Sequence, residues 1–290
     1  MTRATPIIRP ARLADASAIA GFTTNTFAWG DYVGEEFPQW LQEPGTKVAV
    51  VVDDDDIPVA VAKVRMIGSR EGWLSAARVH PDHRRRGLGS ALNDWCVEWV
   101  ASRGGVVCRL QIEDDNEPAS QQVMQLGYRP VLEVLNGERP TRLPPDANGF
   151  PHTAVPERLQ KSPRAEADLA YIAWSTSDLG RASRGMFATE PWAWRRLEED
   201  DLRTGILWAC PSGWVLTDSD EGHLDVRWLM CAPEDVDRLM PAVVELADRT
   251  GQSHISVAVA RVGWVTDSLS RLGFTTLHDS SLYEKAVGLT

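Results

Sequence analysis

The alternation of apolar and polar positions in the first half of the chain predicts strands and helices in a regular order. Two β-rich runs, 47–52 and 58–66, flank four consecutive aspartates and predict a hairpin. A strand over 72–80, a helix over 87–105, a strand over 106–112 and a short helix over 118–126 follow. This order predicts an α/β layer fold.

The second half of the chain repeats this order more faintly. Leu126-Gly127-Tyr128 returns as Leu272-Gly273-Phe274, and the surrounding pattern of strands and helices matches. We interpret this as an internal duplication, although a short helix-ending motif can also recur by chance. Seven prolines between residues 130 and 163 predict a connection. The predicted organisation is therefore two tandem lobes, 1–140 and 164–290, joined by a proline-rich connection over 141–163.

Composition narrows the classes of partner. The chain has 290 residues, with 30 basic against 41 acidic side chains and a net charge of -11, which disfavours binding to a nucleic-acid backbone. Four scattered cysteines form neither a disulfide framework nor a metal motif, and no run reaches the roughly 18 apolar residues of a membrane helix. We expect a cytoplasmic protein, monomeric or homodimeric, that binds a small molecule and neither nucleic acid nor membrane.

The segment 77–92 carries the most chemical information. A strand ends at His80, a turn and three arginines follow, and Gly87-Leu88-Gly89 leads into a helix. A glycine-bearing loop at a helix N-terminus presents unpaired N–H groups and the positive end of the helix dipole, which bind a phosphate. The alternative is a helix start that only needs flexibility. The Lys-Ser/Thr pair of a Walker loop and the third glycine of a dinucleotide motif are both missing, which disfavours those two classes.

This segment resembles the pyrophosphate loop of the GNAT acyltransferase superfamily, which reads Arg/Gln-x-x-Gly-x-Gly/Ala after a strand ending in Val-x-Pro. The positions that match are Val79, Pro81, Arg84, Gly87 and Gly89. Downstream, Asn116, Ala119 and Gly127-Tyr128 also match the family pattern, whereas Val123 stands where the family often has a tyrosine. The resemblance covers residues 3 to about 140 with specific motifs, and the second half only as a degenerate copy. For each lobe it implies a mixed, mostly antiparallel twisted sheet flanked by helices.

The resemblance implies an N-acetyltransferase that moves an acetyl group from acetyl-CoA to a primary amine by direct attack in a ternary complex. It implies no metal, and His80 and His83 have no third ligand nearby in the sequence. The acetyl-CoA contacts that it implies fall on the strand end, the loop, the helix start and one asparagine: Ala77, Val79, Arg84, Arg85, Arg86, Gly87, Leu88, Gly89, Ser90 and Asn116. A noncatalytic acetyl-CoA sensor is the alternative function.

Two residues are candidates for proton transfer. Glu113 ends the strand that follows the phosphate-loop helix and is the candidate base for the amine, although it can equally be a solvated carboxylate. Ser120 is the candidate proton donor to the departing thiolate, or an exposed helix serine. Val123 cannot replace the family's tyrosine, and we expect it to face the core.

The acceptor site is expected in the loop after the first helix, where aromatic and acidic side chains suit a cationic amine. The candidates are Trp29, Asp31, Tyr32 and Glu35, and this segment resembles histidine N-acetyltransferase-like members of the superfamily. The alternative is that the aromatic residues are core anchors and the acids solvated caps. In the second lobe, the stretch equivalent to the phosphate loop has no glycine and carries Glu234, Asp235 and Asp237, so we expect no acetyl-CoA there.

Overall fold

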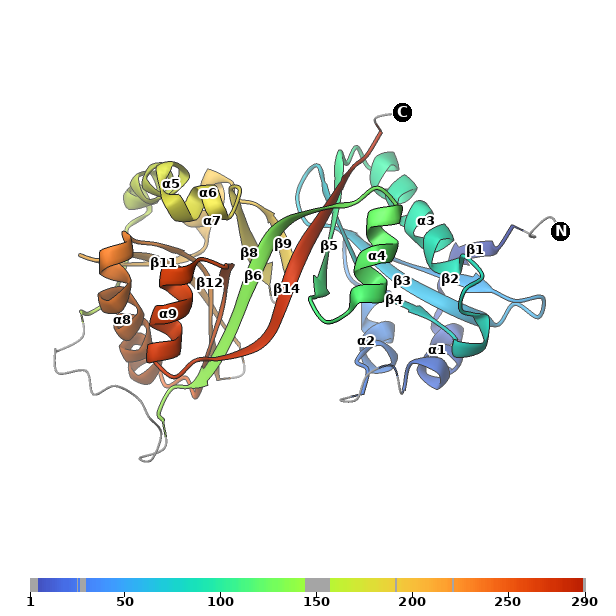
Figure 1. The fold of residues 1–290 in the computed structure, drawn as a ribbon, viewed down its shortest axis with the longest axis horizontal. Coiled ribbons are helices and arrows are strands. Elements are labelled where there is room, and N and C mark those ends of the chain that lie inside the picture. Colours follow the sequence, from blue (N-terminus) through green and yellow to red (C-terminus); the bar gives the residue numbers. More distant parts are fainter. Residues whose placement is uncertain are drawn as a thin grey trace. The chain divides into compact units, whose positions relative to one another are not determined.

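The computed structural model describes residues 5–24, 26, 30–143, 157–190, 192–220 and 222–288, without the side chains of 276–278. The chain forms two compact units (Figure 1). Unit 1 comprises residues 1–111, 118–129 and 283–290, and unit 2 comprises 112–117 and 130–282. This division differs from the predicted lobes, because the strand after Arg129 belongs to unit 2 and the C-terminal residues belong to unit 1.

The sheet of unit 1 is antiparallel except at its last pair. The strands run in the order β1 (Ile7–Pro10), β2 (Thr46–Val52), β3 (Pro58–Met66), β4 (Glu71–Val79) and β5 (Val107–Glu113). Strand β5 is parallel to β4, and the predicted hairpin is confirmed as β2 and β3. Successive residues of β2 are buried, as in a sheet with both faces covered.

Helices cover this sheet. They are α1 (Ala16–Thr23), α2 (Val33–Trp40), α3 (Leu88–Ser102) and α4 (Glu117–Gln125). Ile19, Phe37 and Trp40 from α1 and α2 pack into one core cluster with Val50 and Ala76 of the sheet. Phe37 and Trp40 are therefore core residues. This agrees with the alternative given above, that aromatic residues of the acceptor segment belong to the core. Helix α3 packs against β2, β3 and β4.

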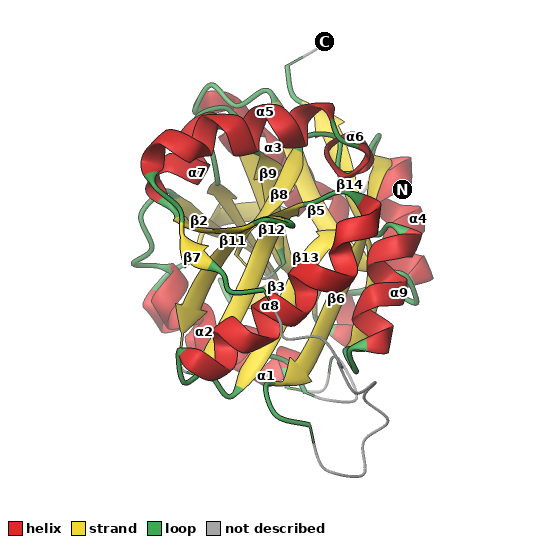
Figure 2. Cartoon of the chain, turned by 90° about the vertical axis from the view of Figure 1, so that its left-hand side faces the viewer, coloured by secondary structure: helices red, strands yellow, loops and turns green. Residues whose placement is uncertain are grey.

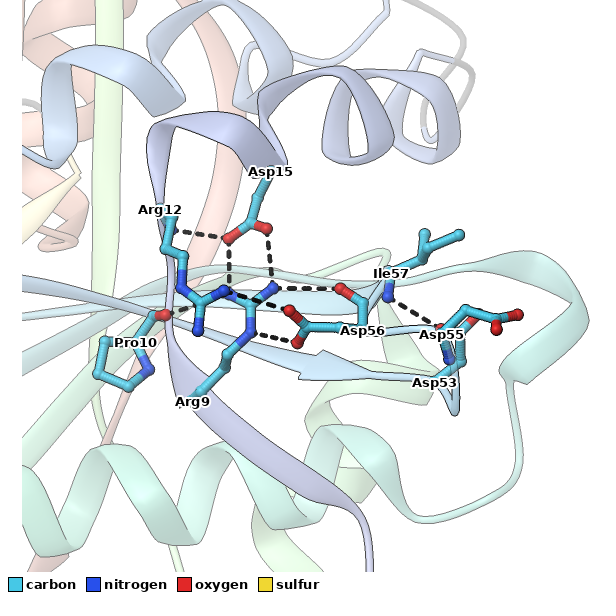
Figure 3. Close-up of polar contacts among 8 residues, drawn as sticks. All are labelled: Arg9, Pro10, Arg12, Asp15, Asp53, Asp55, Asp56 and Ile57. Atoms are coloured by element: carbon cyan, nitrogen blue, oxygen red, sulfur yellow. Dashed lines mark hydrogen bonds and ion pairs between the residues drawn. The ribbon is translucent and has the colours of Figure 1, made fainter.

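The aspartate run between β2 and β3 is held by arginines of the N-terminal strand and the turn after it (Figure 3). Arg9 Nε donates to Asp56 Oδ1 at 2.7 Å, and Arg12 Nη1 donates to Asp56 Oδ2 at 3.1 Å. Arg9 also donates to both carboxylate oxygens of Asp15, at 2.8 and 2.9 Å. Among the described residues, no group of three or more His, Cys, Asp and Glu could hold a metal ion. The run is thus a turn braced by ion pairs.

Asp15 is expected to make the stability of unit 1 depend on pH. Burial alone would raise the pKa of Asp15, but hydrogen bonds from Arg9 and from the Arg12 N–H hold that pKa below its ordinary value. The stabilisation is therefore complete above about pH 4 and is lost as the pH falls through the folded pKa. Asp15→Asn should lower the free energy of unfolding by about 2 kcal/mol at pH 7. Urea unfolding from pH 7 to 2.5 checks this, and a difference that stays constant to pH 2.5 contradicts it.

Unit 2 repeats the pattern of unit 1. Its strands are β14 (Thr275–Ala286), β6 (Arg129–Pro140), β13 (His254–Ala260), β12 (His223–Met230), β11 (Gly213–Asp220), β10 (Ile206–Cys210) and β7 (Gln160–Lys161). As with β4 and β5 in unit 1, β12 and β13 are its parallel neighbours, which confirms the predicted duplication. The first two of the seven prolines lie in a strand that precedes the predicted connection 141–163. Pro130 and Pro140 stand near or at the ends of β6, where a missing N–H is tolerated.

The helices of unit 2 are α5 (Ala167–Thr176), α6 (Asp178–Ala182), α7 (Glu199–Thr204), α8 (Val236–Arg249) and α9 (Gly263–Arg271). Helices α8 and α9 pack together over the strands (Figure 2). A separate hairpin of β8 (Met186–Glu190) and β9 (Ala193–Arg196) was not predicted. None of the helices in the described ranges is long and apolar enough to cross a membrane.

The C-terminal residues complete unit 1. Arg109, only 2% exposed, pairs with Glu71 and, at 3.2 Å, with Glu284. The Val287 N–H donates to the Val106 carbonyl at 2.8 Å. The Lys285 ammonium lies 5.8 Å from the centroid of the Tyr128 ring. A segment that begins 283 residues into the chain is thus built into the first unit.

Candidate active site

The parallel strands β4 and β5 separate halfway along their length. They pair from Glu71 opposite Val107 to Trp73 opposite Arg109, and the described pairing ends there although β4 continues to Val79. Beyond Trp73, the edge of β4 that faced β5 therefore has backbone groups outside the parallel ladder. Such an edge can bind an extended, amide-bearing chain, as an added strand does.

A bulge in the pairing of β4 with β3, on the other edge of the strand, reshapes the same stretch of β4. Val61 of β3 pairs with Arg78, but Lys63 pairs with Ser75, so β4 has one extra residue between these pairs. Ala76 in the bulge has a φ of 55°, an unusual value for a residue with a side chain. Ala77 is exposed beside it and Val79 is half-buried. Both residues predicted to meet the pantetheine arm thus lie on the open stretch of β4.

The loop after β4 presents the N-terminus of α3. Gly87 stands at the N-cap with a φ of 82°, and no side chain caps the 15-residue helix. The left-handed conformation explains the glycine, and the missing cap leaves first-turn N–H groups for a ligand. A Cβ at Gly89 would lie 2.8 Å from Gln122 Nε2 of α4, the end of a flexible side chain that can move, so packing alone does not require this glycine. Leu88 is buried and anchors the turn.

Three exposed arginines surround this N-terminus. Arg84 Nε lies 3.4 Å from the Val79 carbonyl, and Arg86 Nη2 donates to the Asp82 carbonyl at 3.0 Å. Arg85 has a φ of 61°, so the loop has a second left-handed residue before Gly87. Neighbouring left-handed residues turn successive N–H groups towards one side, which is how backbone anion sites are built. Loop, helix dipole and arginines together suit a pyrophosphate.

The candidate proton-transfer residues are divided between the units. Glu113 ends β5 half-buried and its carbonyl accepts from the Asn116 N–H at 3.0 Å; both residues belong to unit 2. Ser120, also half-buried, lies on α4 in unit 1. The Val123 side chain is 9% exposed and faces the core, as predicted. The roles of Glu113, Ser120 and Asn116 stay predictions.

The acceptor segment is fixed to β4 by an ion pair. Arg78 Nε donates to Asp31 Oδ2 at 2.6 Å, and the Asp31 side chain is fully buried. Asp31 Oδ1 accepts from the Val33 N–H at 3.1 Å and so begins α2. Burial alone would raise the pKa of Asp31, but the hydrogen bond from Arg78 is the first of several interactions that hold the pKa below its ordinary value. Asp31 is therefore already paired, not a free site for a cationic amine.

The remaining acceptor candidates have different surroundings. Tyr32 is 37% exposed, with its ring centroid 6.0 Å from that of Trp40. Glu35 is exposed on the first turn of α2. Trp29 lies outside the described residues. Of the candidates that the structure describes in this segment, Tyr32 and Glu35 are the exposed ones.

Unit 2 has the same strand geometry without the phosphate loop. Pairing of β12 with β13 ends at Val226 opposite Val257, although both strands continue. Here the hairpin strand β8 packs against both β12 and β13, and Arg227 donates to the Thr189 carbonyl of β8. The N-cap of α8 is Asp235, in a right-handed conformation. An acidic helix start repels a phosphate, which agrees with the predicted loss of cofactor binding.

Comparisons with known proteins define the class. Residues 17–128 match the family model described as Acetyltransferase (GNAT) family. The chain therefore carries a GNAT acetyltransferase domain, in agreement with the resemblance of its phosphate loop.

Particular relatives are similar to a larger part of the chain, one in sequence and two in fold. It is 31% identical over 199 residues to a mycothiol acetyltransferase of Mycolicibacterium vanbaalenii, an alignment that covers 66% of this chain and 59% of that protein. A GCN5-related N-acetyltransferase of Sphaerobacter thermophilus superposes with a TM-score of 0.62 and 19% identity, over 97% and 95% of the two chains. A tandem GNAT protein from the clavulanic acid biosynthesis pathway gives 0.57 and 14%, over 99% and 100%. The two structural likenesses show a shared tandem fold.

Proposed function

We propose that this chain transfers an acetyl group from acetyl-CoA, bound by the phosphate loop of unit 1, to the primary amine of a small molecule or amino acid. The observation that carries this proposal is the uncapped, glycine-led N-terminus of α3, which follows a stretch of β4 that is no longer paired with β5 and is bulged in its pairing with β3. The N–H groups of the first turn, with Arg84, Arg85 and Arg86, would bind the pyrophosphate. Backbone groups of Ala77 and Val79 would hold the pantetheine amides.

The proposed reaction is a direct displacement at the thioester. The amine nitrogen attacks the thioester carbonyl carbon, the C–N bond forms, and the C–S bond breaks with the electron pair leaving on sulfur. An alkylammonium has a pKa near ~10.4, so a base must take a proton from the amine at neutral pH. Glu113 is the proposed base, and Ser120 the proposed proton donor to the thiolate. The acceptor would approach past Tyr32 and Glu35.

Acetyl-CoA turnover on an amine panel tests this function. With amino acids, amino sugars and polyamines as acceptors, we expect thiol release with at least one amine. Glu113→Gln should lower kcat by about 100-fold at pH 7.5, and part of this loss should disappear above pH 9 as the free amine becomes abundant. Ser102→Ala, at the far end of α3, is the control. Saturable acetyl-CoA binding without thiol release from any acceptor would favour a noncatalytic sensor, which the buried Val123 also suits.

A further inference from the structure

One guanidinium joins the cofactor strand to the acceptor segment. Arg78 follows the bulge of β4, and its side chain is 13% exposed. Its Nη1 donates to the Ala77 carbonyl at 3.1 Å, while Nε and Nη2 donate to the two Asp31 oxygens at 2.6 and 3.3 Å. Each of its three nitrogens therefore has a partner on one of the two segments that the proposed reaction must bring together.

The other contacts of this pair extend to α2. The Asp31 carboxylate that Arg78 binds also accepts the Val33 N–H, so the first turn of α2 is fixed through the same two oxygens. The Arg78 guanidinium lies 5.7 Å from the centroid of the Tyr32 ring, which fixes the exposed aromatic candidate of the acceptor segment. A lysine ammonium is a point charge and cannot make this forked set of contacts.

We propose that Arg78 is a positioning residue for acetyl transfer, acting through Asp31 to hold Tyr32 and the start of α2 against β4. The proposal rests on the acetyltransferase function proposed above. Within the described part of the chain, Arg78 is the charged group that hydrogen-bonds to the fully buried Asp31 carboxylate. Asp31 therefore positions the acceptor segment and does not bind the charged amine of the acceptor. A displacement of about 1 Å in such geometry is enough to cost on the order of 100-fold in rate.

The kinetic test compares Arg78→Lys, Arg78→Gln, Asp31→Asn and the double variant Arg78→Gln/Asp31→Asn, with the best amine of the panel. We expect kcat/KM to fall about 10- to 100-fold in the single variants, including Arg78→Lys, while the Kd for acetyl-CoA changes less than about 3-fold. Because both residues act as one unit, the double variant should be no worse than the worse single variant. Each single variant leaves one charge of the buried pair without its partner, and the double variant removes both charges. It therefore keeps the test valid if a single variant unfolds.

Amide hydrogen exchange provides a readout that does not depend on activity. Exchange over residues 33–40 should rise about 10-fold or more in Arg78→Gln, while exchange over α3 stays unchanged. The control is Arg142→Gln, which removes an exposed ion pair with Asp248 in unit 2 and should change neither readout. Three results would overturn the proposal. The first is a loss of kcat/KM in the double variant that equals the product of the losses in the two single variants. The others are wild-type kinetics in Arg78→Lys and unchanged exchange over 33–40. A wild-type protein that turns over no amine would instead refute the proposed function, and the exchange result would still decide the positioning role.

Discussion

Replacing Gly87 with glutamate is expected to weaken acetyl-CoA binding by about 100-fold or more. Gly87 has a φ of 82° at the N-cap of α3, where a side chain is strained and disturbs the direction of the first-turn N–H groups. The new carboxylate would also stand where the pyrophosphate charge is expected. A loss of about 3 kcal/mol in binding corresponds to this factor. Calorimetric titration with acetyl-CoA measures it.

Gly104→Glu is the matched control for this substitution. Gly104 lies just after the other end of α3 with a φ of 78°, and a Cβ there meets nothing within 4 Å. The variant therefore has the same added charge and a similar backbone strain, far from the proposed pyrophosphate. Its affinity for acetyl-CoA should stay within about 2-fold of wild type. Equal losses in both variants would show that Gly87 acts through stability and not through the ligand.

Deleting residues 283–290 is expected to unfold unit 1, although the deletion lies at the far end of the sequence. It removes Glu284 from the buried Arg109 and takes away the buried side chains of Tyr283 and Val287. Breaking a buried ion pair costs about 3–5 kcal/mol, and each lost apolar side chain about 1.5–3 kcal/mol. The sum is of the order of the whole stability of a domain. Circular dichroism and acetyl-CoA titration of the 1–282 chain measure the effect.

A fragment ending at residue 140 should fail for the same reason. The control for the deletion is Ala286→Ser, an exposed position on the same strand, which should leave unfolding and acetyl-CoA affinity unchanged. A 1–282 chain that binds acetyl-CoA as tightly as the full chain would contradict the placement of the C-terminal residues in unit 1.

The sequence predicts those parts of the fold that depend on local signals. Two β-rich apolar runs around an acidic turn are enough to predict the β2–β3 hairpin, and apolar residues three and four positions apart are enough to predict α3. The exchange of strands between the two halves has no such signal. Nothing local to residues 129–140 or 283–288 shows which sheet they join, because strand pairing depends on partners more than a hundred residues away. The prolines at 130 and 140 also argued against a strand between them, so β6 was not predicted.

The candidate site divides in the same way. The phosphate loop is contiguous, and its glycines carry the backbone conformation themselves, so the motif alone locates it. Arg78 was missed because its partner Asp31 is 47 residues away. An arginine near the end of a mostly apolar strand was the available signal. The sequence could not show that a buried arginine already pairs with Asp31.

The central claim is that the loop before α3 forms the acetyl-CoA site and that unit 2 has lost its equivalent. The most direct test is a calorimetric titration of the full chain with acetyl-CoA, repeated on Gly87→Glu. We predict a single site per chain, which disappears in the variant. Two sites per chain, binding that survives in Gly87→Glu, or no binding by the wild-type protein would contradict the claim.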